Sequence, residues 1–189
     1  MIAYHVVTER PMRVGQQIYF DEKNKSGVYQ RVMDKLEIVN NIYANPSKYN
    51  QDTLEHHTSV ALRELAMEEV RQKKYPQYPS RMAGLYVAKS FEEALSWAEF
   101  FAQIGRPTYN IVKLQIDGNC FMGDAEKCFK GQLSKEQNLI LAEEYWKKPF
   151  DSSKQGICEM LVDGKITVLE SVREINANLD KQMWIFRKF

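Results

Sequence analysis

Three short capping sequences constrain where the helices of this chain can begin. In each of them a side-chain oxygen can accept a hydrogen bond from the backbone N–H three residues later, and an acidic or amide side chain at that later position can reach back. They start at Asp52, Ser90 and Ser134 and place Glu55, Glu93 and Gln137 three residues on. We therefore predict helices over 53–73, 90–102 and 134–146, and apolar residues spaced by three and four predict another over 28–44.

Short β-branched and aromatic runs alternate with these helices. Strands are expected at 2–7, 16–20, 83–88 and 109–116, and Met183–Phe186 is interpreted as a last strand. The runs 157–162 and 165–169 flank Asp163-Gly164, a pair typical of a type I′ hairpin turn. This order predicts an α+β fold with a small, bent, mixed or antiparallel β-core, flanking helices and a helical insert at 28–73.

Length and charge narrow the function classes. The chain has 189 residues, which suits one domain over 1–189. Its 26 basic and 25 acidic side chains leave a net charge of +1, which argues against a nucleic-acid partner because such proteins usually carry a basic excess.

The cysteines and the N-terminal sequence bear on the compartment. Cys120, Cys128 and Cys158 form no disulfide framework, and no histidine pair has metal-binding spacing, so we expect reduced thiols and no metal. The first residues lack the basic and apolar regions of a signal peptide, and no apolar run approaches the roughly 20 residues of a spanning helix. A cytoplasmic protein without a membrane partner is the resulting expectation.

Three polar residues stand in strand-like settings and are the candidate functional residues: His5, Tyr86 and Glu159. A carboxylate among apolar neighbours must reach solvent, find a partner or line a cleft, and an edge-strand charge that discourages aggregation is an alternative for Glu159. A histidine satisfied by a backbone carbonyl is the alternative for His5, and a core aromatic is the alternative for Tyr86.

The order of these residues resembles the motifs of a known fold. Tyr4-His5, followed by Thr8 and a loop containing Gly15, is similar to the first motif of ADP-ribosyltransferases. The segment 80–98, with Tyr86 before a capped helix, resembles their second motif, most closely in the rifampicin-modifying type. Glu159 falls where that family keeps its acidic third position. The whole chain also resembles a small bacterial family with no known function.

The resemblance implies an ADP-ribosyltransferase-like fold and NAD as the substrate. Glu159 would stabilise the oxocarbenium ion formed when the nicotinamide–ribose bond breaks. His5 would hydrogen-bond a ribose hydroxyl with help from Thr8, and Tyr86 would stack on the nicotinamide ring. Arg81 or Arg13 would lie near the pyrophosphate. The insert at 28–73 would cap the cleft or form a homodimer contact, and the acceptor, a small molecule or a protein, is left open.

Two other functions stay open. The strand motif is His5-Val6-Val7-Thr8 where the antibiotic-modifying branch has His-Gly-Thr, and Ile157 replaces an acidic or amide residue two before Glu159. These departures favour a catalytically inactive domain that binds a ligand or a protein. RNA binding through the basic and tyrosine-containing segment 71–81 is the third candidate, with a solvated loop as its structural alternative.

Overall fold

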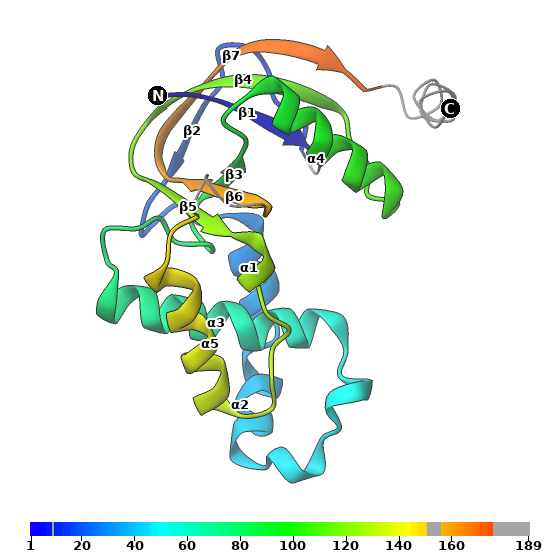
Figure 1. Ribbon diagram of the computed structural model, residues 1–189, viewed down its shortest axis with the longest axis vertical. Coiled ribbons are helices and arrows are strands. Elements are labelled where there is room, and N and C mark those ends of the chain that lie inside the picture. The colour runs from blue at the N-terminus through cyan, green and yellow to red at the C-terminus, as the bar shows by residue number, and fades with distance from the viewer. Residues whose placement is uncertain (9, 151–155, 176–189) are drawn as a thin grey trace. The chain divides into compact units, whose positions relative to one another are not determined.

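The computed structural model describes residues 1–8, 10–150 and 156–175 (Figure 1). The chain divides into two compact units, and each is described by itself. Unit 1 comprises Met1–Tyr19, Tyr86–Gly118 and Lys165–Phe189, and unit 2 comprises Phe20–Leu85 and Asn119–Gly164. The α+β class is confirmed, because helices accompany two antiparallel sheets. One domain over 1–189 stays a prediction.

A four-stranded sheet forms the frame of unit 1. Its order is β1-β4-β7-β2, with bounds Ile2–Val7, Asn110–Asp117, Gly164–Glu174 and Gln17–Phe20. Val6 of β1 faces Ile111 of β4 in the antiparallel register. The β4–β7 register shifts at Ile111/Val112 and again at Lys113/Leu114. Such irregularities locally bend strands and increase their twist.

Helix α4 (Phe91–Gln103) packs on this sheet through small residues. The side chain of Ser90 accepts a hydrogen bond from the backbone N–H of Glu93, which confirms the predicted cap. Ala94 and Ala98 are buried in one cluster with Val6 and Ile111. Because alanine adds little bulk, the helix axis can lie close to the strands.

Unit 2 is built mainly from helices α1 (Gly27–Met33), α2 (Leu36–Ala44), α3 (His56–Lys74) and α5 (Lys135–Lys147). One apolar cluster joins the first three helices and consists of Val32, Val39, Ile42, Ala61, Leu62 and Met82. Trp146 of α5 is fully buried and its Nε1 donates a hydrogen bond to the carbonyl of Met67 at 2.9 Å. Short 3₁₀ turns occupy Pro46–Lys48, Gln51–Thr53 and Ala125–Lys127.

The second sheet has the order β3-β6-β5, with bounds Leu85–Val87, Cys158–Val162 and Cys120–Asp124. The boundary between the units falls within β3, after Leu85. Gly123 of β5 lies opposite Glu159 of β6 in their antiparallel register. Strand β5 was not predicted, because its Cys-Phe-Met-Gly-Asp sequence contains few residues with strong strand preference.

Two helix predictions are corrected. The helix expected at 28–44 is interrupted at Asp34 and Lys35, so α1 and α2 are separate. The predicted cap Asp52 is wrong, because Asp52 belongs to the 3₁₀ turn Gln51–Thr53. Glu55 caps α3 instead, and its carboxylate accepts hydrogen bonds from the backbone N–H groups of His57 and Thr58.

The predicted hairpin at Asp163-Gly164 is also wrong. Strand β6 pairs with β5, whereas β7 pairs with β4 in the other sheet. Gly164 has φ +77°, but Asp163 does not share a positive φ, and a type I′ turn requires it at both positions. The Asp163 carboxylate instead accepts a hydrogen bond from the Asn119 N–H at 2.8 Å. The pair therefore carries the chain from one sheet to the other.

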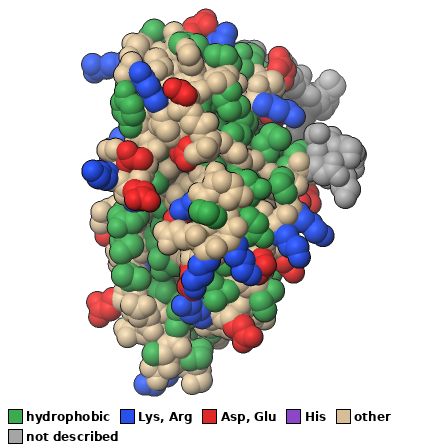
Figure 2. Space-filling view, turned by 90° about the vertical axis from the view of Figure 1, so that its left-hand side faces the viewer, with side chains coloured by type: hydrophobic (Ala, Val, Ile, Leu, Met, Phe, Trp, Pro, Cys, Tyr) green, Lys and Arg blue, Asp and Glu red, His purple; other side chains and the backbone are tan. Residues whose placement is uncertain are grey.

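Surface and membrane properties follow from the described residues. On the face shown in Figure 2, basic side chains lie among acidic ones. Within the described ranges, no helix is both long and apolar enough to cross a membrane. The predicted strand Met183–Phe186 lies outside the described residues.

Candidate functional site

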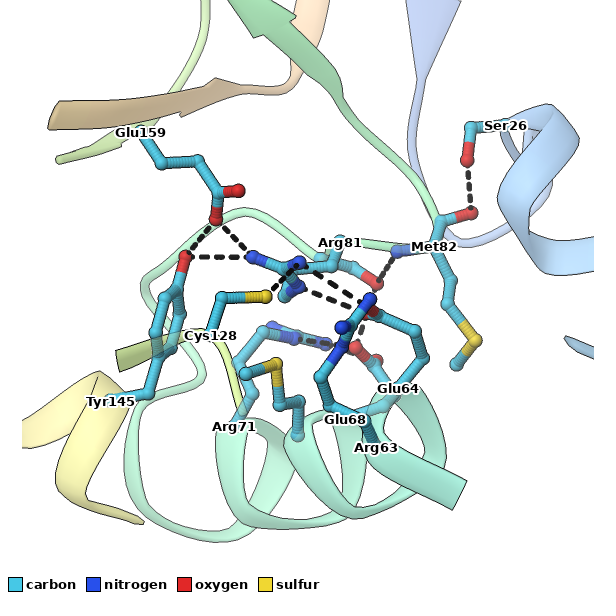
Figure 3. Close-up of polar contacts among 12 residues, drawn as sticks. Ser26, Arg63, Glu64, Glu68, Arg71, Arg81, Met82, Cys128, Tyr145 and Glu159 are labelled. Atoms are coloured by element: carbon cyan, nitrogen blue, oxygen red, sulfur yellow. Dashed lines mark hydrogen bonds and ion pairs between the residues drawn. The ribbon is translucent and has the colours of Figure 1, made fainter. Parts of the chain in front are cut away.

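A buried group of polar side chains surrounds Arg81 in unit 2, and we call it the charged cluster: Arg63, Glu64, Arg81, Cys128, Tyr145 and Glu159 (Figure 3). Arg81 is 4% exposed. Its Nε donates to Glu64 Oε2 at 2.8 Å and its Nη2 donates to Glu64 Oε1 at 3.2 Å. Its Nη1 donates to the Tyr145 hydroxyl at 2.9 Å and also pairs with Glu159 Oε1. One guanidinium therefore joins helix α3, helix α5 and strand β6.

A tight turn presents Arg81 to helix α3. The Ala83 N–H donates to the Ser80 carbonyl at 3.0 Å, and the Met82 N–H donates to the Ser80 hydroxyl at 3.1 Å. That hydroxyl donates in turn to Glu68 Oε2 at 2.7 Å, which ties the turn to α3. A Cβ at Gly84 would lie 2.8 Å from the Ser80 carbonyl oxygen, so glycine is required for the chain to leave the turn along this path.

The ions of the charged cluster balance, with two arginines and two glutamates. Arg63 Nη2 lies 2.8 Å from Glu64 Oε1. Burial alone would raise the pKa of Glu64, but the charges of Arg81 and Arg63 outweigh burial and lower it. Burial would likewise lower the pKa of Arg63, and the charge of Glu64 raises it. Both groups therefore stay charged near neutral pH, and the pairing offsets the cost of burying them.

Glu159 lies in the middle strand of its sheet, so the alternative of an edge-strand charge is excluded. Its side chain is 15% exposed. Oε1 accepts a hydrogen bond from the Tyr145 hydroxyl at 2.6 Å in addition to the Arg81 pair. Oε2 has no hydrogen bond within the described part of the chain. One carboxylate oxygen is thus held by two donors.

Tyr145 and Gly123 were not found from the sequence. Tyr145 is fully buried, and burial, together with the charge of Glu159, raises its pKa well above 10 against the opposing charge of Arg81. A Cβ at Gly123 would lie 2.7 Å from the Tyr145 hydroxyl oxygen, so the missing side chain makes room for that hydroxyl. A glycine within a strand often marks close approach by another group, but this signal could not be used because strand β5 was not predicted.

Cys128 contacts the cluster but has no nucleophilic character there. Arg81 Nη2 lies 3.5 Å from its sulfur. Burial nevertheless raises the pKa of this thiol, since it outweighs the lowering by Arg81 and Arg63, and the thiol stays protonated. Among the described residues, no group of three or more His, Cys, Asp or Glu side chains is arranged to hold a metal ion.

His5, in unit 1, makes a hydrogen bond to the backbone of another candidate residue. Its Nδ1 lies 2.7 Å from the Tyr86 carbonyl oxygen. A carbonyl can only accept, so Nδ1 carries the proton. Burial lowers the pKa of His5 to about 4, despite the opposing effect of this hydrogen bond. The ring is therefore neutral near pH 7, and Nε2 presents a lone pair that no described residue uses. The hydrogen bond to a backbone carbonyl that the alternative interpretation of His5 required is therefore present.

The other predicted site residues are divided between the units. The ring of Tyr86 is half-buried in β3, Thr8 follows β1 directly, and Arg13 is exposed in the loop before β2. The structure brings His5 and the Tyr86 backbone together in unit 1. In unit 2 it brings Arg81 and Glu159 together. The guanidinium of Arg81 is committed to the charged cluster, so Arg13 is the exposed member of the two arginines expected near a pyrophosphate.

The segment 71–81 is largely engaged within unit 2. Arg71 donates to Glu68 and to the carbonyls of Pro76 and Tyr78. The Tyr78 ring packs on Phe121, with ring centroids 4.5 Å apart. These contacts occupy side chains that an RNA surface would need, and they favour the loop interpretation of this segment.

Comparison with known proteins identifies a family whose function is unknown. A family model described as a protein of unknown function (DUF2441) matches residues 3–174. No curated protein matches the chain. The expectation of a family with no known function is therefore confirmed.

Proposed function

We propose that this chain, which belongs to the DUF2441 family of proteins of unknown function, binds NAD in the manner of ADP-ribosyltransferases. The observation that carries the proposal is the state of His5. A neutral imidazole with its Nδ1 proton given to the Tyr86 carbonyl has Nε2 as a hydrogen-bond acceptor. A ribose hydroxyl is a matching donor, and the carbonyl fixes the ring in the orientation that presents Nε2.

The distribution of the motif residues over strands supports the same proposal. His5 lies on β1, Tyr86 on β3 and Glu159 on β6, and the capped helix α4 follows Tyr86 as the second motif requires. Tyr86 would stack on the nicotinamide ring, with Thr8 and Arg13 near the ribose and pyrophosphate.

Glu159 would carry the chemistry. The bond between ribose C1′ and the nicotinamide nitrogen breaks, and its electron pair leaves with nicotinamide. The resulting oxocarbenium ion is stabilised by the Glu159 carboxylate through Oε2. A hydroxyl, amine or water then attacks C1′ and releases its proton to solvent. Arg81 and Tyr145 hold Oε1, so the carboxylate keeps its orientation.

The binding test uses His5→Asn, because an asparagine amide can still donate to the Tyr86 carbonyl while the Nε2 acceptor is lost. Calorimetric titration with NAD should show affinity about five- to tenfold weaker than in the wild type, the effect of one hydrogen bond. His56→Asn changes an exposed histidine of α3 and serves as the matched control. Equal affinity in the wild type and His5→Asn would contradict the role of His5.

The catalytic test uses Glu159→Gln, which keeps the shape of the side chain and removes its charge. Nicotinamide release from NAD, followed by chromatography, should fall at least about a hundredfold, as expected when electrostatic stabilisation of a transition state is lost. Retained NAD cleavage in Glu159→Gln would contradict the catalytic role of Glu159.

A second candidate function is a domain that binds the same ligand without cleaving it. The pairing of Glu159 with Arg81 favours it, because a neighbouring cation weakens the field that a carboxylate exerts on a developing positive charge. NAD binding that depends on His5, together with no nicotinamide release from the wild type, would select this candidate over the transferase.

A further inference from the structure

Tyr145 has the geometry of a residue that acts through Glu159. Its hydroxyl accepts a hydrogen bond from Arg81 Nη1 at 2.9 Å and donates one to Glu159 Oε1 at 2.6 Å. A hydroxyl with one proton can satisfy both contacts only when that proton points at the carboxylate. The tyrosine ring is fully buried, and its centroid lies 5.1 Å from the Arg81 guanidinium carbon. The direction of the hydroxyl is therefore set by fixed neighbours.

The absence of a side chain at Gly123 leaves room for the Tyr145 hydroxyl to reach the Glu159 carboxylate. It lies opposite Glu159 on the neighbouring strand, where most residues would place a side chain across from the carboxylate. A Cβ there would lie 2.7 Å from the Tyr145 hydroxyl oxygen and 2.9 Å from a Phe121 ring carbon. Phe121 is 2% exposed and packs on Tyr145, so neither ring has room to move aside.

We propose that Tyr145 is a positioning residue. Its hydroxyl, for which Gly123 leaves room, holds Oε1 of Glu159 on the side of Arg81, so that Oε2 can act on the ribose of NAD. This inference rests on the proposed function. Tyr145 touches no substrate in this arrangement. It limits the carboxylate to one rotamer, and so it affects the chemical step and leaves NAD binding unchanged.

The first experiment separates kcat from KM for nicotinamide release. Tyr145→Phe keeps the packed ring and removes the hydroxyl, and kcat should fall about ten- to a hundredfold with KM unchanged, as expected for lost orientation of a reacting group. Tyr43→Phe is the matched control, because it removes another hydroxyl of unit 2 that hydrogen-bonds Asn138 at 2.9 Å and does not contact Glu159. A rise in KM at constant kcat in Tyr145→Phe would overturn the positioning role.

The second experiment asks whether Tyr145 acts only through Glu159. In the Glu159→Gln background, Tyr145→Phe should cause no further loss of kcat, because no charged carboxylate is left to orient. Independent, multiplying losses would overturn the inference. Gly123→Ala should reproduce the kcat loss of Tyr145→Phe, and wild-type kcat in Gly123→Ala would also overturn it.

A readout without NAD distinguishes the failure of this inference from the failure of the proposed function. The Tyr145 hydroxyl proton should give a slowly exchanging downfield proton resonance that disappears in Tyr145→Phe and moves in Glu159→Gln. A resonance that is unaffected by Glu159→Gln overturns the positioning inference alone. No nicotinamide release from the wild type overturns the proposed transferase, and the catalytic role of Tyr145 with it, whatever the resonance does.

Discussion

Unit 1 holds a half-buried histidine that is neutral, and unit 2 holds a buried glutamate that is charged. In unit 1, His5 meets a backbone carbonyl and no counter-ion, and its pKa is lowered to about 4, so the ring is neutral. In unit 2, Glu64 is 2% exposed and meets two arginines, which lower its pKa and keep it charged. Burial penalises charge in both places, and an opposite charge at hydrogen-bond distance decides the outcome.

This difference has a functional consequence. A neutral imidazole offers a lone pair that suits a sugar hydroxyl, whereas a paired carboxylate offers charge in a fixed direction. Under the proposed function, the imidazole would serve recognition of the ribose and the carboxylate would serve stabilisation of a cation. Each unit can therefore be tested by a substitution at the residue that determines the charge, which is Arg81 in unit 2 and His5 in unit 1.

The largest effect is expected when the charged cluster loses its central cation. Arg81→Met should lower the free energy of unfolding by about 3–5 kcal/mol, because Glu159 is left without its ion pair and Glu64 keeps only Arg63. Urea denaturation at pH 7 measures the change. Lys74→Met removes an exposed ion pair with Glu143 and should leave the urea midpoint in place. Equal urea midpoints for the two variants would show that Arg81 does not stabilise the charged cluster of unit 2.

A smaller effect is expected from the pH dependence of unit 1. Unfolded His5 takes up a proton near pH 6.5, whereas folded His5 does so near pH 4. The unfolded state therefore binds more protons between these values, and stability falls as the pH is lowered through this window. The gap corresponds to about 3 kcal/mol at most. Urea unfolding from pH 7 to pH 4 should show this loss in the wild type, and His5→Asn should lack that part of it.

The smallest effect is expected from the helix caps, one in each unit. Ser90→Ala removes the cap of α4, and Ser134→Ala removes the cap of α5, where the hydroxyl accepts a hydrogen bond from the Gln137 N–H. Each should cost about 1 kcal/mol in thermal or urea unfolding. Capping is local chemistry, so the two costs should agree even though the units differ in buried charge. A difference of several kcal/mol would show that the two units differ in more than their buried ions.

Local patterns in the sequence predicted the parts of the fold that depend on neighbours along the chain. The caps at Ser90 and Ser134 were confirmed, as were strands at 2–7 and 16–20 within a residue or two. The cap at Asp52 and the hairpin at Asp163-Gly164 were wrong, because distant partners decided them. Pairing of β6 with β5, whose partner residues lie 34 to 42 positions earlier in the chain, outweighs the turn preference of Asp-Gly.

The candidate site shows the same division. His5, Tyr86 and Glu159 could be singled out because each is polar in an apolar strand. That Glu159 pairs with Arg81 and Tyr145 could not be foreseen, since 78 and 14 residues separate these partners in the chain. Spacing along the chain predicts contacts only within a helix turn or between paired strands of known register.

The sequence by itself determined the α+β class, the beginnings of two helices and the residues worth testing, since all three depend on preferences of a few adjacent residues. Only the tertiary structure decided which of these side chains are charged and which residues they contact. A carboxylate or an imidazole is charged or neutral according to the atoms packed around it, and those atoms come from segments that only the folded chain brings together.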